Sequence, residues 1–187
     1  MKIIKTFFDE AVKLIEYDKF NDDRGYFSVT YNKSNFKQIN INQNFLQDNF
    51  SYSKTVNTFR GIHYQKKPYE QAKLINIIKG SIFDVFVDLR LNSKTFGQFE
   101  SVKLDSAKNL LFIPEGFGHA FLTLENDTLI HYKISNKYNL ESEQTIIWND
   151  KELKIDWPKF DSKMILSEKD KNGISLQNFK LKNLDNK

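Results

Sequence analysis

The sequence contains no cysteine, and only three prolines and seven glycines occur among its 187 residues. Without cysteine the chain can form no disulfide framework, no thiolate nucleophile and no cysteine-based zinc or iron–sulfur site. It also has no run of about 18 consecutive apolar residues, and Asp9 and Glu10 interrupt the one apolar stretch near the N-terminus. We therefore expect neither a membrane span nor a secretory signal, and we expect the protein to be cytoplasmic.

Histidine is also scarce, since only His63, His119 and His131 occur. A histidine-rich metal cage would need nearly all of them. The 28 Lys and Arg residues outnumber the 24 Asp and Glu residues, which gives a net charge of +4, but the charges are interspersed. This scattered excess is typical of a solvated surface and argues against nucleic acid as a partner. It is compatible with a small anionic ligand, which needs only a few converging cations.

Aromatic residues are abundant, with 17 Phe and 8 Tyr, and together with the β-branched residues they favour strands. The clearest strand pattern covers Ile82–Arg90, where apolar and charged side chains alternate with a period of two. Further short strands are predicted at Lys2–Phe8, Tyr26–Tyr31, Phe59–Gln65, Lys73–Ile78, Leu110–Ile113, His119–Leu124 and Leu129–Ile134. Many short strands separated by turn-forming residues are typical of a sandwich or barrel, so we expect an all-β fold.

Helical signals are weak along the whole chain. The sequence predicts one short helical turn near Glu10–Glu16. Residues 177–187 mix Asn and Lys with little periodicity, so we expect a loosely held tail there. Because we find no internal repeat, no low-complexity linker and no domain boundary, we expect a single domain over residues 1–187.

The string from Pro114 to His119 is the first that carries chemical information. Its proline and two glycines force a tight turn, which delivers the imidazole of His119 to the start of an apolar strand. This spacing resembles the second signature of the cupin superfamily of small β-barrels. Metal-binding cupins also carry a His-x-His pair, whereas the counterpart here reads His63-Tyr64-Gln65, so we expect a metal-free cupin. The alternative for His119 is a core histidine that bonds to the backbone.

The string from Arg60 to Gln65 is the second. On a strand, Gly61, His63 and Gln65 share one face. Polar side chains that are buried without a partner are costly, so such a face needs water or a ligand. Taken alone, His63 is equally compatible with a packing role and a functional role. The cations of Arg60 and Lys73 nearby favour a site for an anionic ligand.

Eight strings occur in an order that resembles the dTDP-4-dehydrorhamnose 3,5-epimerase family of sugar-nucleotide enzymes, from about Phe20 to Asp170. They are Asp23–Phe27, Gln47–Asn49, Arg60–Gln65, Val87–Arg90 with Thr95–Gly97, Ile113–His119, Tyr132–Lys133, Trp148–Asp150 and Leu166–Asp170. Each string is weakly specific by itself, and the resemblance depends on the ordered set.

The resemblance implies a cupin-type jelly-roll β-barrel with short peripheral helices, which forms a homodimer and needs no cofactor. It also implies an isomerase that inverts carbons 3 and 5 of a nucleoside-diphosphate 4-keto-6-deoxy sugar. Both carbons adjoin the carbonyl at carbon 4, so loss of a proton gives an enolate, and inversion requires a proton to return from the opposite face. Two groups must therefore flank the sugar ring.

The resemblance also assigns roles to individual residues. His63 is the base, Asp170 orients it, and Tyr132 is the acid on the other face of the ring. Lys73 stabilises the developing oxyanion. The resemblance implies substrate contacts from Arg24, Gln47, Asn49, Arg60, His119, Tyr138, Glu143 and Lys169.

Each of these residues also has a purely structural interpretation. From periodicity alone Tyr132 is a core residue, and Asp170 fits the start of a C-terminal helical turn. Lys73 could lie along the surface with its charge in water. Arg24 could simply close the turn after two aspartates, whereas together with Arg60 it would offer a diphosphate two bidentate contacts.

One position departs from the family pattern, because Val29 stands where the family commonly has a Glu that contacts the nucleoside. The choice between a dTDP-linked and a GDP-linked sugar is therefore open, as are hexose against heptose and inversion at carbon 3 alone against both carbons. Three further alternatives are a ketoisomerase that moves the keto group between carbons 4 and 3, a metal-dependent cupin, and a non-catalytic carbohydrate-binding cupin.

Overall fold

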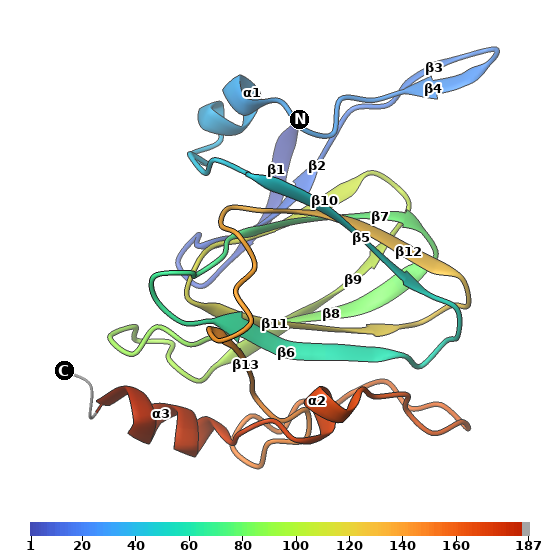
Figure 1. Cartoon of the computed structure of the whole chain (residues 1–187). Helices are drawn as coiled ribbons and strands as arrows, with labels where there is room; N and C mark the ends of the chain where they lie inside the picture. Colours follow the sequence, from blue (N-terminus) through green and yellow to red (C-terminus); the bar gives the residue numbers. More distant parts are fainter. Residues whose placement is uncertain (185–187) are drawn as a thin grey trace.

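Two antiparallel sheets face each other and form a jelly-roll β-barrel in the structure, a computed structural model that describes residues 1–184 (Figure 1). The six-stranded sheet is ordered β1 (Lys2–Phe7), β2 (Val12–Glu16), β10 (Asn109–Ile113), β7 (Lys73–Lys79), β12 (Thr128–Ile134) and β5 (Gln47–Ser53). The five-stranded sheet is ordered β13 (Glu143–Thr145), β6 (Phe59–Gln65), β11 (Phe117–Thr123), β8 (Ser81–Asp88) and β9 (Phe99–Asp105). The all-β prediction is confirmed.

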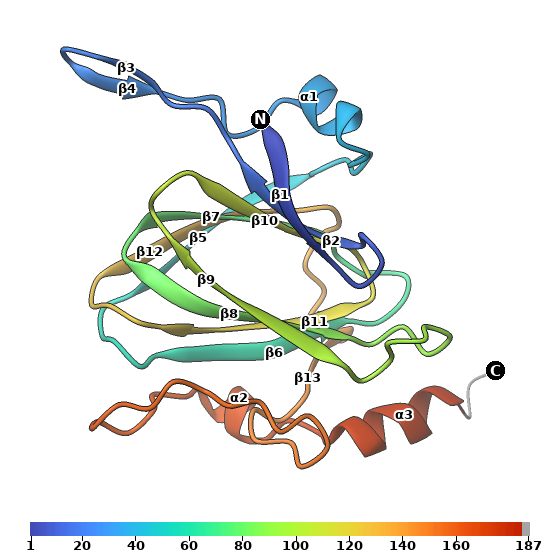
Figure 2. The same cartoon turned by 180° about the vertical axis from the view of Figure 1, so that it is seen from behind.

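Three short helices and one hairpin lie outside the barrel. The helices are α1 (Lys33–Gln38), α2 (Glu168–Lys171) and α3 (Leu176–Leu184). The hairpin pairs β3 (Phe20–Asp22) with β4 (Gly25–Phe27) and projects from the body in both views (Figures 1 and 2). It replaces the longer strand expected at Tyr26–Tyr31. No helix within residues 1–184 is long and apolar enough to cross a membrane.

The strand β2 shows that the helical turn expected near Glu10–Glu16 was wrong. Val12 and Leu14 belong to the core between the sheets, while Ile15 packs on the outer side together with Phe36 of α1. Because both faces of this strand are covered, apolar side chains occupy consecutive positions. The alternation that marks a half-buried strand is therefore absent, and the pattern could not be told from a helical one.

The C-terminal segment covers the outer face of the five-stranded sheet (Figure 1). Leu176 and Phe179, which are only 4% and 5% exposed, share one face of α3 and pack in this outer cluster. Residues 177–184, where we expected a loosely held tail, belong to the helix α3, and Phe179 packs in this cluster. Residues 185–187 lie outside the described residues. The assignment of the chain to a single domain stays a prediction.

Candidate active site

A cavity of about 290 Å³ opens between the two sheets. Its walls come from both sheets, because β5, β7 and β12 contribute from one side and β6 and β13 from the other. It is lined by Gln47, Asn49, His63, Tyr64, Gln65, Gln71, Lys73, Tyr132, Ile134, Tyr138 and Glu143. The structure therefore brings together three of the four predicted catalytic residues and four of the predicted substrate contacts.

The local shape of β6 delivers His63 to this cavity. Gly61 has a φ of +142°, and a Cβ atom at this position would lie 2.2 Å from the Cβ of Ala120 on the neighbouring strand. Only glycine permits this conformation and this close approach. His63 lies directly opposite His119 of β11 and Thr145 of β13, so its imidazole is placed in the middle of a three-strand row.

The fourth predicted catalytic residue, Asp170, contacts His63 from outside the sheet. Its Oδ1 lies 2.6 Å from His63 Nε2, and its side chain is 3% exposed. Asp170 occupies the first turn of α2, where the hydroxyl of Ser167 accepts a hydrogen bond from its backbone N–H. The helix-start interpretation of Asp170 is therefore confirmed, and the same turn holds its carboxylate against the imidazole of His63; its functional role stays a prediction.

Burial and hydrogen bonding act in opposite directions on this pair. Burial lowers the pKa of His63 below its usual value, and the hydrogen bond to Asp170 offsets this only in part. Burial raises the pKa of Asp170, but the hydrogen bond and charge of His63, together with the hydrogen bond from Ser167 and the charge of Lys169, leave it below its usual value. At neutral pH the pair is thus a carboxylate and a neutral imidazole. Nε2 donates to Asp170, which leaves the lone pair of Nδ1 available as a base.

Tyr132 and Lys73 are placed on the opposite sheet. Tyr132 packs against the core between the sheets and also lines the cavity, so its packing does not rule out the predicted role. Burial raises the pKa of its phenol, which keeps the hydroxyl protonated at neutral pH. Burial lowers the pKa of Lys73 to about 8. Lys73 is half-buried and lines both cavities, so its side chain does not lie along the outer surface of the barrel.

Three predicted substrate contacts form a cluster at the rim of the cavity. Glu143 accepts a hydrogen bond of 2.9 Å from the Tyr138 hydroxyl. It also forms an ion pair of 2.8 Å with Lys169. Burial raises the pKa of Glu143, but the hydrogen bonds from Lys169 and Tyr138 leave it below its usual value. The Tyr138 ring is 51% exposed, so one of its faces is available for contact with a ligand.

His119 of β11 and Arg60 of β6 lie on neighbouring strands of the five-stranded sheet and line neither cavity. His119 Nε2 and Asp84 Oδ2 form a hydrogen bond of 2.8 Å. The partner of His119 is therefore a carboxylate and not the backbone, as the alternative interpretation had it. The guanidinium of Arg60 donates to the Tyr52 carbonyl and to the Ser53 hydroxyl.

Four predicted substrate contacts do not line the cavity, namely Arg24, Arg60, His119 and Lys169, and Arg24 lies outside the barrel altogether. It lies in the turn of the projecting hairpin, its side chain is 89% exposed, and its guanidinium pairs with Asp22 at 2.6 Å. The expected pairing of Arg24 with Arg60 around a diphosphate therefore does not occur within one chain. Val29, which follows the hairpin, is also exposed.

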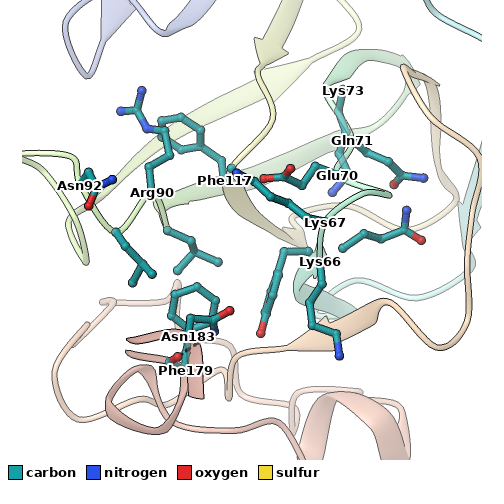
Figure 3. Close-up of a pocket in the computed structure, with 15 residues that line it drawn as sticks. Lys66, Lys67, Glu70, Gln71, Lys73, Arg90, Asn92, Phe117, Phe179 and Asn183 are labelled. Atoms are coloured by element: carbon teal, nitrogen blue, oxygen red, sulfur yellow. Dashed lines mark hydrogen bonds between the residues drawn. The ribbon is translucent and has the colours of Figure 1, made fainter. Parts of the chain in front are cut away.

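Sequence analysis missed a second cavity of about 580 Å³ (Figure 3). It adjoins the first cavity, because both are lined by Tyr64, Gln65, Gln71 and Lys73. Its other walls come from the loops after β6 and β8 and from α3 (Figure 3). These segments are far apart in the sequence, so no local pattern could have indicated the cavity.

Asp84 was also missed as part of the site. The alternation in Ile82–Arg90 placed Asp84 and Asp88 on one face, yet both are 0% exposed. The face that carries them turns into the barrel, while the apolar face that carries Val85 and Val87 lies under the C-terminal segment. The sequence shows only that the two aspartates share a face, and nothing local indicates that this face is buried.

The metal-binding capacity of the described part of the chain is limited. Within residues 1–184 no group of three or more His, Asp or Glu side chains is arranged to hold a metal ion. Two of the histidines pair with carboxylates instead: His63 pairs with Asp170, and His119 pairs with Asp84.

Comparisons with known proteins agree with this geometry. The family model for dTDP-4-dehydrorhamnose 3,5-epimerase matches residues 9–178. The dTDP-4-dehydrorhamnose 3,5-epimerase of Methanothermobacter thermautotrophicus is 42% identical over 174 residues, which cover 91% of this chain and 92% of the relative. The crystal structure of the Bacillus anthracis enzyme with TDP and PPi bound aligns with a TM-score of 0.89 at 42% identity, covering 93% of this chain and 98% of that chain.

A second solved structure carries a sugar nucleotide. It is a dTDP-6-deoxy-D-glucose-3,5-epimerase from Legionella pneumophila in complex with dTDP-4-keto-L-rhamnose. It aligns with a TM-score of 0.88 at 37% identity and covers 94% of this chain and 93% of that chain. The chain described here therefore belongs to the dTDP-4-dehydrorhamnose 3,5-epimerase family.

Proposed function

We propose that this isomerase inverts carbons 3 and 5 of a dTDP-linked 4-keto-6-deoxy sugar, with His63 as base and Tyr132 as acid. One observation carries the proposal: His63 and Tyr132 line the same cavity from opposite sheets, and Asp170 holds the far nitrogen of the imidazole. The relative from Legionella pneumophila, which binds dTDP-4-keto-L-rhamnose, supports the substrate class.

The first step removes a proton next to the keto group. His63 Nδ1 takes the proton, and the electrons of the carbon–hydrogen bond move onto the oxygen at carbon 4, which becomes an enolate oxygen. Lys73, as an ammonium, stabilises this negative charge, and Asp170 stabilises the imidazolium. No cofactor is needed, because the keto group of the substrate accepts the electrons.

The second step returns a proton from the other face of the ring. The Tyr132 hydroxyl donates to the carbon, the keto group re-forms and Tyr132 becomes a phenolate. His63 then holds one extra proton and Tyr132 lacks one. Before the second carbon reacts, His63 releases its extra proton to water in the open cavity and Tyr132 takes up a proton from water.

The nucleotide end of the substrate extends toward the rim of the cavity. Gln47 and Asn49 of β5 and the cluster of Tyr138, Glu143 and Lys169 offer amide, aromatic and charged groups there. A nucleobase stacks on an exposed aromatic ring such as that of Tyr138. His119 and Arg60 lie on the adjoining strands of the five-stranded sheet and complete the contacts that we assign to the substrate.

We also propose that the protein acts as a homodimer in which the hairpin of one copy supplies Arg24 to the cavity of the other. The hairpin projects into solvent and exposes Phe20, Tyr26 and Phe27 by 61%, 59% and 67% (Figures 1 and 2). A two-stranded hairpin with three exposed aromatic side chains is only marginally stable by itself, and such an exposed apolar patch marks a surface that a partner covers. Sedimentation showing a stable monomer at micromolar concentration would contradict this arrangement.

Isotope exchange in deuterated water tests the proposed reaction. The protein is incubated with dTDP-linked and GDP-linked 4-keto sugars, and NMR locates the deuterium. Label at carbons 3 and 5 of the dTDP sugar is the expected result. Label at carbon 3 alone would restrict the reaction to one centre, and binding without any exchange would indicate a carbohydrate-binding protein. A requirement for a stoichiometric metal would indicate a metal-dependent cupin.

A further inference from the structure

The segment that carries Asp170 is fastened to the five-stranded sheet at both ends. At one end Ile165 forms a parallel bridge with Thr58, just before β6, through two backbone hydrogen bonds of 2.9 Å. At the other end Ile174 forms the same kind of bridge with Ile146, just after β13, again through two bonds of 2.9 Å. Between these anchors lies α2, a single turn of four residues (Figure 1). A helix of this length is not stable by itself, so its position depends on its side-chain contacts.

Two consecutive residues of α2 contact two neighbouring strands of this sheet. Asp170 Oδ1 lies 2.6 Å from Nε2 of His63 on β6. Lys169 Nζ lies 2.8 Å from Oε1 of Glu143 on β13, the strand that pairs with β6. In the part of the chain that the structure describes, these are the hydrogen bonds and ion pairs that join the side chains of α2 to the sheet.

Glu143 is a well-fixed attachment point for this ion pair. Its side chain is 15% exposed and lines the same cavity as His63. Its second oxygen, Oε2, accepts the hydrogen bond of 2.9 Å from the Tyr138 hydroxyl. Both carboxylate oxygens are therefore engaged by protein groups, and the ammonium of Lys169 is held at the sheet before any substrate binds.

We propose that Lys169 and Glu143 are positioning residues, whose ion pair holds α2 against the sheet at the place where Asp170 reaches His63. These two rim residues then act on the base through α2, in addition to the substrate contacts that we assign to them. The inference rests on the proposed function, because the orientation of the imidazole matters for turnover only if His63 is the base. Its first test, however, does not depend on activity.

The first test follows the hydrogen bond between His63 and Asp170 in the ligand-free protein. With isotope-labelled histidine, NMR detects the proton on Nε2, and its absence from His63→Ala identifies the signal. This proton exchanges with water when the hydrogen bond opens. In Lys169→Met and in Glu143→Gln we expect the exchange to be about three- to tenfold faster, since a partly exposed ion pair shifts an equilibrium by that much. Lys169→Arg, which keeps the cation, should restore most of the protection.

The two variants together distinguish the loss of a contact from a change of charge. Lys169→Met removes a positive charge near His63 and Glu143→Gln removes a negative one. A purely electrostatic effect would therefore change the exchange in opposite directions, whereas loss of the ion pair changes it in the same direction in both variants.

Lys171→Met is the matched control. Lys171 lies in the same helical turn as Lys169, but it pairs at 2.6 Å with Glu168 of that turn and not with the sheet. This control should leave the exchange unchanged, and circular dichroism checks that each variant is folded. Unchanged exchange in folded Lys169→Met, opposite changes in Lys169→Met and Glu143→Gln, or an equal change in the control would overturn the inference.

The second test separates the positioning role from the substrate contact and from the proposed function. A residue that only contacts the substrate raises KM and leaves kcat unchanged, whereas loss of a positioning residue lowers kcat. In Lys169→Met we expect kcat to fall by about three- to tenfold, in step with the exchange. If the proton exchanges faster and kcat stays at the wild-type level, the ion pair does hold Asp170, but His63 is not the base. That outcome would contradict the proposed function and leave the positioning role intact.

Discussion

Two histidine–carboxylate pairs lie on the neighbouring strands β6 and β11, and they differ in their surroundings. His63 pairs with Asp170 at 2.6 Å and keeps 26% of its side chain exposed, whereas His119 pairs with Asp84 at 2.8 Å and keeps 12% exposed. The carboxylate of the first pair comes from a helix outside the barrel, and that of the second comes from a strand within it. The cavity reaches only the first pair, so we expect His63, and not His119, to act as the base.

Replacing the exposed imidazole is expected to have the largest effect. His63→Ala should abolish deuterium exchange at both carbons, a loss of at least about 10²–10⁴-fold, because a positioned base contributes that much to proton transfer. NMR of the sugar after incubation in deuterated water measures the loss. Near-normal exchange would show that the base is elsewhere, and His119 would then become the candidate.

Replacing the carboxylates of the two pairs should give the next largest effects, and the two effects should be unequal. Asp170→Asn presents an amide N–H to Nε2 of His63 and favours the tautomer with the proton on Nδ1, so the base loses its lone pair. We expect kcat to fall by about 10²-fold or more, as for a triad histidine held in the wrong tautomer. Asp84→Asn should reduce kcat less at pH 7. Equal losses in the two variants would remove the distinction between the pairs.

The acid on the opposite sheet gives a more selective effect. Tyr132→Phe removes the hydroxyl and leaves the packing of the ring against the core in place. Net inversion should fall by about 10²-fold, while His63 continues to wash out the original proton into solvent. Comparing deuterium exchange with product formation measures the split. A parallel loss of both would show that Tyr132 also supports the removal of the proton.

The smallest expected effect is a displaced acid limb of the pH profile. Because burial lowers the pKa of His63 below its usual value of 6.5, the imidazole remains neutral and competent as a base below that pH. Activity should therefore persist as the pH falls through 6.5 and decline only at the lowered pKa of His63. Measurement of kcat/KM against pH checks this. An acid limb at or above 6.5 would mean that the charge of Asp170 outweighs burial.

Much of the barrel could be predicted because strand patterning is local. The strand predicted at Phe59–Gln65 is β6 itself, and that predicted at Lys73–Ile78 differs from β7 by one residue. The strands β5 and β9 were not predicted, because β5 is an edge strand with mostly exposed side chains and β9 alternates only weakly. Strands covered on both faces, such as β2, lose the alternation altogether.

The site could be predicted less completely than the fold. The residues that meet in the cavity were identified through a resemblance and not through spacing, since His63 and Asp170 are 107 positions apart. The position of Arg24 on a projecting hairpin and the burial of Asp84 had no local signal. The position of Arg24 and the burial of Asp84 both depend on how segments that are distant in the sequence pack in the folded protein.

The sequence by itself determined the strands whose two faces differ, and which side chains share a face on them, because the alternation of such a strand is built into neighbouring residues. Only the tertiary structure decided which of those faces encloses the cavity, which histidine the cavity reaches, and that the buried carboxylates of Asp84 and Asp170 pair with the two histidines. The physical reason is that desolvation and the approach of charges depend on elements that are distant along the chain.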